Sequence, residues 1–90
     1  MNPVRPRWFY TYYLKCVKDE TFYTGCTNDL RKRLKEHNQG KVFYTKHRLP
    51  VELIYFEACL NKSDDYRRER YLKTGMGKRY LKNRLKGLTG

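Results

Sequence analysis

The chain has 90 residues, which is enough for one domain near the small end of what folds alone. Lys and Arg number 21 and Asp and Glu number 9, so the net charge is +12. Repulsion on this scale destabilises a compact chain, and an anionic partner such as nucleic acid explains it more simply than a generally basic protein does.

Cysteine usage and apolar content indicate the cellular compartment. Cys16, Cys26 and Cys59 are odd in number and have no CxxC spacing, which argues against a disulfide framework or a zinc site. We expect free thiols in a reducing environment. Residues 1–8 lack the apolar stretch of a secretory signal, and no apolar run approaches the length of a membrane span. The sequence therefore predicts a cytoplasmic protein, associated with the nucleoid if the source is prokaryotic.

The first strand follows an extended lead-in. Pro3 and Pro6 block regular pairing in residues 1–8. Residues 9–17 carry aromatic side chains on both faces, which is typical of a central, largely buried strand.

A hairpin joins this strand to the next one. We expect its turn at residues 18–20 and the second strand to begin at residue 22. With residues 19–20 as a two-residue loop, Cys16 opposes Tyr23 in the ladder. Tyr12 then lies on the same sheet face as Tyr23 and Gly25, because the strand period is two. Gly25 allows the backbone to turn or another group, such as a phosphate, to come close.

The first helix is predicted over residues 28–38. Thr27 or Asn28 can cap it, and Asp29 lies where the helix dipole favours an anion. Gly40 is a plausible C-terminal stop.

Two stripes on this helix have different roles. Leu30 and Leu34 are four residues apart and should face the core. Arg33 and His37 have the same spacing and form a neighbouring stripe. With Tyr23 on the preceding strand, they make a group that could hold a phosphodiester.

The segment 41–50 interleaves basic and aromatic residues, namely Lys41, Phe43, Tyr44, Lys46, His47 and Arg48. Such a segment suits contact with a nucleic-acid strand. The alternative is a solvated connection whose aromatic rings are buried in the core.

Residues 51–58 are apolar on both sides and predict a third strand. Ser63 then opens a helix that runs through Lys73, with two aspartates in its first turn as the dipole prefers. Residues 74–77, with two glycines, should break it. Residues 78–86 are expected to form a short basic helix, and residues 87–90 should fray.

Glu69 is unusual because it is the only acid after residue 65. Tyr66 and Leu72 lie three positions to either side of it, so we expect it to face inward with them. The structural alternatives are an ion pair with an inward arginine or support for Lys73 at i, i+4.

The predicted fold class is α/β (α+β). It is a small three-stranded, mainly antiparallel sheet flanked by helices in the order β-β-α-β-α-α. The domain is expected to span residues 9–86.

The order and spacing of these residues resemble the GIY-YIG nucleases. In that family a Gly-Ile-Tyr strand and a Tyr-Ile-Gly strand precede a helix with an arginine eight positions after the second glycine. The chain has matching segments at Tyr10-Thr-Tyr12, Tyr23-Thr-Gly25 and Arg33, with His37 one turn later. Over residues 9–84 it is most similar to small standalone members akin to the nuclease domain of excinuclease C. Tyr10 replaces the first glycine, and threonines replace both isoleucines.

The resemblance implies the site chemistry. Glu69 matches the family's metal-binding glutamate, and one Mg²⁺ or Mn²⁺ is expected there. Arg33 would neutralise phosphate charge. Tyr12 or Tyr23 would be the base or orient the water, with Tyr12 favoured. Because the ordinary pKa of a tyrosine is about 10, positive charge from Arg33, Lys15 or the metal would have to favour the phenolate, or His37 would accept the proton.

Further residues are expected to support binding. Asn83 resembles an asparagine of some family members, although the intervening glycines weaken the match. The residues expected to contact nucleic acid are Lys15, Arg31, Lys35, Lys46, Arg48, Lys73, Lys78 and Arg79.

The sequence thus predicts a metal-dependent endonuclease acting on double-stranded or branched DNA in repair or recombination. It has little room to read a long site, so cutting should be structure-directed or weakly selective. The alternatives are a non-catalytic nucleic-acid-binding protein that retains the fold, and a protein-interaction module with a basic tail.

Overall fold

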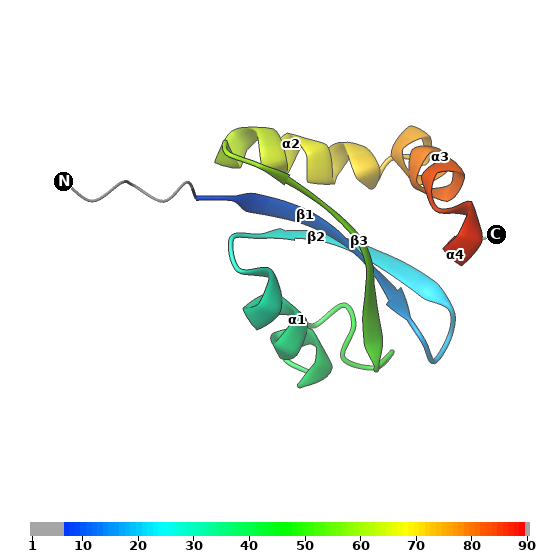
Figure 1. Ribbon diagram of the computed structural model, residues 1–90. Coiled ribbons are helices and arrows are strands. Elements are labelled where there is room, and N and C mark those ends of the chain that lie inside the picture. Colours follow the sequence, from blue (N-terminus) through cyan, green and yellow to red (C-terminus); the bar gives the residue numbers. More distant parts are fainter. Residues whose placement is uncertain (1–6, 90) are drawn as a thin grey trace.

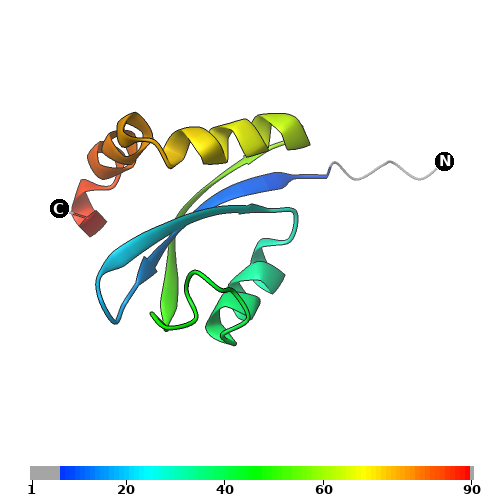
Figure 2. The same ribbon diagram turned by 180° about the vertical axis from the view of Figure 1, so that it is seen from behind.

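A computed structural model describes residues 7–89 of the chain. Its elements are β1 (Phe9–Cys16), β2 (Thr21–Thr27), α1 (Leu30–Asn38), β3 (Val51–Cys59), α2 (Lys62–Leu72), α3 (Gly75–Arg84) and α4 (Lys86–Thr89). The strands form one antiparallel sheet in the order β2-β1-β3. Figure 1 shows α1 on one side of the sheet and α2, α3 and α4 on the other, and Figure 2 shows the same layers from behind. The predicted fold class and element order are confirmed, with α4 added where residues 87–90 were expected to fray.

β1 is the central strand, as its aromatic content predicted, and each of its faces has its own core. Tyr12, Leu14 and Cys16 pack on the side of α1, which we call the α1 face. Tyr13 packs with Leu72 of α2 and with α3 on the opposite side, the α2 face. Among residues 7–89, no helix is both long enough and apolar enough to cross a lipid bilayer.

The hairpin register differs from the predicted one by two residues. Tyr12 opposes Gly25 and Cys16 opposes Thr21, so the turn comprises residues 17–20. The Asp19 carboxylate accepts hydrogen bonds from the backbone and hydroxyl of Thr21, at 3.1 and 2.6 Å, and Glu20 adopts a φ of 58°. Because the shift is an even number of residues, every side chain keeps its predicted face.

The helix starts also differ from the prediction. Asp29, and neither Thr27 nor Asn28, caps α1, where its carboxylate accepts from the Lys32 amide at 3.1 Å. α2 is capped by Asn61 and not by Ser63.

The predicted break at residues 74–77 is shorter than expected, because α3 already begins at Gly75. Thr74 caps α3 by accepting a hydrogen bond from the Gly77 amide at 3.2 Å. Gly77 lies against the end of α2, where a Cβ atom would come 2.5 Å from the Leu72 Cα. A glycine is needed here for close packing of two helices and not for a break.

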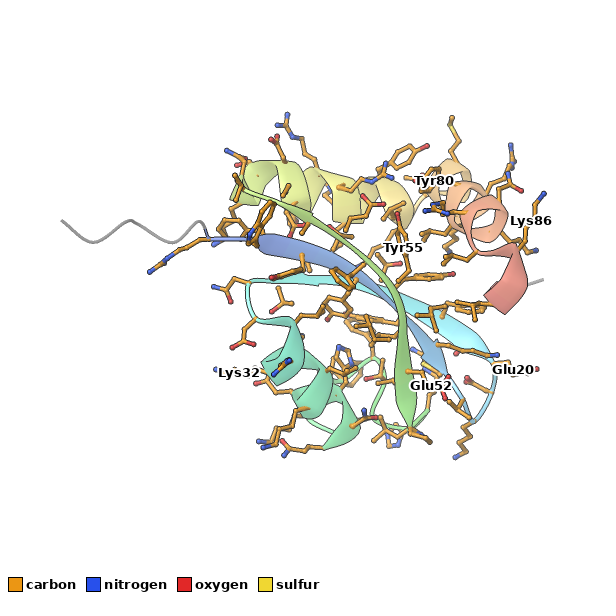
Figure 3. The ribbon with its side chains drawn as sticks, in the orientation of Figure 1. Glu20, Lys32, Glu52, Tyr55, Tyr80 and Lys86 are labelled. Carbon is orange, nitrogen blue, oxygen red and sulfur yellow. The ribbon has the colours of Figure 1, made fainter. Side chains whose placement is uncertain are left out.

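One polar network ties α2, α3 and β3 together. Arg68 donates from Nε and Nη2 to the two oxygens of Glu57, at 2.7 and 3.0 Å. Tyr55 donates to the same carboxylate at 2.8 Å. The Arg68 guanidinium lies 4.8 Å from the Tyr80 ring centroid, and Figure 3 shows Tyr55 of β3 and Tyr80 of α3 in the same region. These contacts fix α2, and therefore Glu69, relative to the sheet.

Candidate active site

Tyr12 is buried against Gly25. The Tyr12 side chain is 2% exposed, and a Cβ atom added at Gly25 would lie 2.5 Å from its Cζ. Among the described residues, Gly40 is the glycine with a positive φ, so Gly25 is not needed for a left-handed turn. The group that comes close to Gly25 is the Tyr12 phenol, and the glycine makes room for it.

A chain of hydrogen bonds runs from Arg33 to Thr45 through Tyr12 and His37. Arg33 Nε donates to the Tyr12 hydroxyl at 3.4 Å. The same hydroxyl lies 2.9 Å from His37 Nε2, and His37 Nδ1 lies 2.7 Å from Thr45 Oγ1. If each group donates to the next, the Tyr12 proton points at His37 Nε2 and the imidazole proton lies on Nδ1.

Burial determines the protonation states in this chain. It raises the pKa of Tyr12 to about 12, although the hydrogen bond from Arg33 acts in the opposite direction. It also lowers the pKa of His37 to about 4, and the Arg33 charge adds to this. At neutral pH the pair is therefore a neutral phenol facing a neutral imidazole, which can accept its proton. Of the two alternatives, a resting phenolate is therefore not favoured, and proton acceptance by His37 remains.

Tyr23 lies half-buried on the edge strand β2, where it contacts Tyr12 and His37 and also Lys73. Its ring centroid is 6.4 Å from that of Tyr12 and 5.2 Å from that of His37. Tyr44 stacks beside it at 6.3 Å. The ammonium of Lys73, the residue that caps the C-terminus of α2, lies 5.7 Å from the same ring. Tyr23 is thus the point where contacts from α1 and α2 meet.

Glu69 lies at the boundary of the buried side of α2, next to β2. Its side chain is 12% exposed, and Oε1 lies 3.3 Å from Lys73 Nζ, which is the predicted i, i+4 alternative. Burial, followed by the neighbouring Glu69 carboxylate, raises the pKa of the Cys26 thiol to about 11. Glu69 shares its side of the helix with the buried Leu72, but the prediction that Tyr66 faces inward with it is wrong, because Tyr66 is 54% exposed.

The two halves of the site lie on opposite faces of the sheet. Tyr12, His37 and Arg33 belong to the α1 face, and Glu69 belongs to the α2 face. Each half has a neighbour on β2, along whose outer edge no other strand of residues 7–89 pairs: His37 contacts Tyr23, and Glu69 lies beside Cys26. The surface there is hollowed, with one hollow of about 270 Å³ lined by Arg33 and Cys26 among others. A phosphodiester seated on this edge would meet groups from both faces.

The residues around Glu69 fit a hard divalent ion. The carboxylate is paired with a half-exposed lysine and not locked by an arginine. Mg²⁺ and Mn²⁺ bind through one or two carboxylates and keep several waters, so one glutamate is a sufficient protein ligand. In the described part of the chain, no group of three or more His, Cys, Asp or Glu residues could enclose an ion. A fully protein-coordinated site of the zinc type is therefore not formed by these residues.

The residues predicted to bind nucleic acid fall into three groups. Arg31, Lys35, Lys46, Lys73, Lys78 and Arg79 are exposed, as such contacts require. Lys73 and Lys78 line a hollow of about 700 Å³ beside Tyr23.

Arg48 has structural partners, the Tyr44 carbonyl at 3.0 Å and Thr21 Oγ1 at 3.1 Å. Arg48 thus fastens the 41–50 loop to β2.

Lys15 and Asn83 are not brought to the site. Strand alternation places Lys15 on the α2 face, away from the Tyr12 hydroxyl, so it does not supply the charge expected there. Asn83 is exposed, and its position on α3 is opposite to that of Leu81 and Leu85, which pack on the sheet.

Two features escaped the sequence reasoning. Thr45 completes the hydrogen-bond chain, but nothing in an irregular loop connects it with His37. Thr11, which replaces an isoleucine of the family pattern, donates to the buried Asp65 carboxylate at 2.7 Å. That substitution was a usable signal, because a hydroxyl on a buried strand requires a polar partner.

Comparisons with known proteins agree with this geometry. A family model described as the GIY-YIG catalytic domain matches residues 8–85. A UPF0213 protein of Clostridium perfringens (strain 13) is 54% identical over 65 residues, covering 71% of this chain and 69% of that protein. One from Streptococcus pyogenes serotype M3 is 56% identical over 54 residues, covering 59% and 58%.

The chain is also similar to a solved structure. The solution NMR structure of a UPF0213 protein from Bacillus halodurans matches with a TM-score of 0.54 and 34% identity, covering 87% of this chain and 85% of that one. The chain therefore belongs to the GIY-YIG catalytic-domain family.

Proposed function

We propose that the protein is a metal-dependent endonuclease that hydrolyses phosphodiester bonds in double-stranded or branched DNA, in a structure-directed manner and in a repair or recombination role. The observation that carries this proposal is the Tyr12–His37–Thr45 hydrogen-bond chain beside Arg33. It provides a proton acceptor and a phosphate-binding group at the same edge that Glu69 reaches from the other face.

Proton transfer is assigned to Tyr12 and His37. As water attacks phosphorus, its proton passes to the Tyr12 oxygen while the phenol proton passes to His37 Nε2. A P–O bond forms, the bond to the leaving sugar oxygen breaks, and that oxygen takes a proton from solvent. Because Tyr12 gains one proton as it loses another, its high pKa does not limit the step; the net proton acceptor is His37, whose lowered pKa makes it a weak base. Tyr12 is preferred to Tyr23 as the base because its hydroxyl bonds His37.

Arg33 has two tasks in this scheme. Its contacts with Tyr12 and Glu36, at 3.4 and 3.5 Å, are both long, so the guanidinium can turn towards a phosphate at little cost. That movement would release the Tyr12 hydroxyl from its contact with Arg33. Glu69 would hold the metal ion, which when bound would supply positive charge to the leaving alkoxide. Lys73, released from Glu69, would then be available to the phosphate backbone.

The test is cleavage of supercoiled plasmid and of branched DNA in Mg²⁺, Mn²⁺ or EDTA. Glu69→Gln and Arg33→Ala should each lower the cleavage rate by about 100-fold or more. The matched control is Glu52→Gln, an exposed glutamate at the far end of β3 (Figure 3), which should cut at the wild-type rate. Cleavage in EDTA, or wild-type rates for the first two variants, would refute the catalytic assignment.

The burial of Tyr12 favours a second candidate, a nucleic-acid-binding protein that retains the fold without turnover. It predicts salt-sensitive binding that is indifferent to divalent metal and to Glu69→Gln. Metal-dependent turnover would exclude it.

A further inference from the structure

Two aromatic rings beside the candidate site are left in solvent. Phe43 is 73% exposed and Tyr44 is 65% exposed, and we call this pair the aromatic shelf. Their rings meet edge to face, with centroids 5.4 Å apart. The reading in which the loop aromatics are buried in the core is therefore wrong.

The shelf is held rigidly by its flanking residues. Val42 and Thr45, on either side, are 5% and 0% exposed. The loop forms a helical turn in which the amides of Thr45 and Lys46 donate to the Val42 carbonyl, at 3.2 and 2.9 Å. Because the turn is anchored at both ends, Phe43 and Tyr44 point outward in a fixed orientation. Their exposed rings do not contribute to the packing of the core.

The shelf is continuous with the candidate active site. Tyr44 stacks on Tyr23, with an interplanar angle of 24°. Thr45 also bonds His37 Nδ1, so the loop that carries the shelf shares a residue with the hydrogen-bond chain. A ligand on the shelf therefore has a defined position relative to the reacting phosphate.

Positive charge accompanies the rings. Lys46 Nζ lies 5.1 Å from the Phe43 ring centroid, and Lys73 Nζ lies 5.7 Å from the centroid of the Tyr23 ring on which Tyr44 stacks. Exposed aromatic faces flanked by lysines are the arrangement with which proteins bind unpaired nucleic-acid strands, because bases stack on the rings while phosphates meet the cations. In a continuous duplex the bases are already stacked on one another and offer no face to such rings.

We propose that the Phe43–Tyr44 shelf stacks one unpaired nucleobase next to the phosphate at Tyr23, so that the preferred DNA substrate carries an unpaired nucleotide at the cutting position. This rests on the proposed action on DNA and specifies which branched structures are selected, namely those with a flap, a bulge or a single-stranded end at the cut.

The test measures binding in EDTA, where the proposed metal-dependent cleavage cannot occur. One probe is a short DNA duplex with a single unpaired 2-aminopurine, and the other is the fully paired duplex of the same sequence. The wild-type protein should bind the unpaired probe about tenfold more tightly, which corresponds to ~1.4 kcal/mol, and stacking should quench its fluorescence.

The variant Phe43→Leu/Tyr44→Leu keeps the apolar bulk but removes the ring faces. It should lose the preference and the quenching while binding the paired duplex as the wild type does, because the lysines remain. Met76→Ala, an apolar residue of α3 that is 68% exposed, is the control and should change neither. Thermal melting should show the wild-type fold for both.

Equal affinity for the two probes, or quenching that survives in the double variant, would overturn the shelf. Quenching lost in the double variant supports the shelf even if the wild type cleaves nothing, in which case the nuclease proposal fails alone. If the protein cleaves paired and unpaired DNA equally and does not quench the probe, the shelf proposal fails and the nuclease proposal stands.

Discussion

The substitution Gly25→Ala tests whether Tyr12 occupies the space above this glycine. The new Cβ would lie 2.5 Å from Tyr12 Cζ and 3.0 Å from Tyr23 Cε1. Tyr12 cannot move aside freely, since it is buried and its hydroxyl is bonded to His37 at 2.9 Å. The phenol must shift, and the hydrogen-bond chain must break.

The cost follows from the two effects. Overpacking a well-packed site costs ~1–3 kcal/mol, and losing the buried hydrogen bond adds ~1 kcal/mol. A loss of ~2–4 kcal/mol in the free energy of unfolding lowers Tm by at least about 8 °C in a domain of this size. The assay is thermal melting followed by circular dichroism, with cleavage measured on the folded variant at low temperature.

Two other glycines provide the comparison. At Gly75, in the first turn of α3, an added Cβ meets nothing within 4 Å, so Gly75→Ala should raise stability by ~0.4–1 kcal/mol. At Gly77 the obstacle is the backbone of α2, which cannot rotate away, so Gly77→Ala should be at least as damaging as Gly25→Ala. Melting of Gly25→Ala at the wild-type temperature would refute the packing argument.

Three further predictions concern the hydrogen-bond chain and the network on α2. Thr45→Val removes the partner of His37 Nδ1 and should lower the cleavage rate by about 10-fold or more, whereas Thr45→Ser should restore it. Burial holds the pKa of His37 at about 4, below its ordinary 6.5, so the unfolded chain binds this proton more readily. Stability is then full above pH 6.5 and falls as the pH decreases towards 4. Urea unfolding at pH 7 and pH 5 should show this loss in the wild type and a smaller one in His37→Gln; equal losses would contradict it. Arg68→Lys breaks the two-pronged bond to Glu57 and should cost ~1–2 kcal/mol, while Arg67→Lys, with a side chain 75% exposed, should change the melting midpoint little.

The fold was predictable because aromatic and β-branched runs alternate with capped amphipathic segments. The register was not, because the turn depends on how the Asp19 carboxylate and the positive φ of Glu20 are combined, which residue types do not specify. The faces were nevertheless right, since an error of two residues preserves the alternation.

The candidate site was predictable where it follows strand and helix periodicity. Tyr12, Arg33 and His37 meet because their spacing on regular elements brings them together. Thr45 was not predictable, because the loop that carries it has no period, and for the same reason the exposure of Phe43 and Tyr44 could only be given as one of two alternatives. Lys15 was misplaced because its charge was considered without the face to which strand alternation assigns it.

β2 has a consequence for how the protein tolerates heat. Tyr23 and Gly25 belong to a strand that pairs with β1 alone within residues 7–89, whereas Tyr13 lies on the central strand and packs in a cluster with Leu72 and Leu81. Peeling away an outer strand requires less free energy than dismantling a packed interior. Warming should therefore separate β2 from β1 and inactivate the protein while the rest of the fold is still intact. The stability of the hydrogen-bond ladder between β1 and β2 then sets the highest temperature at which the protein is active.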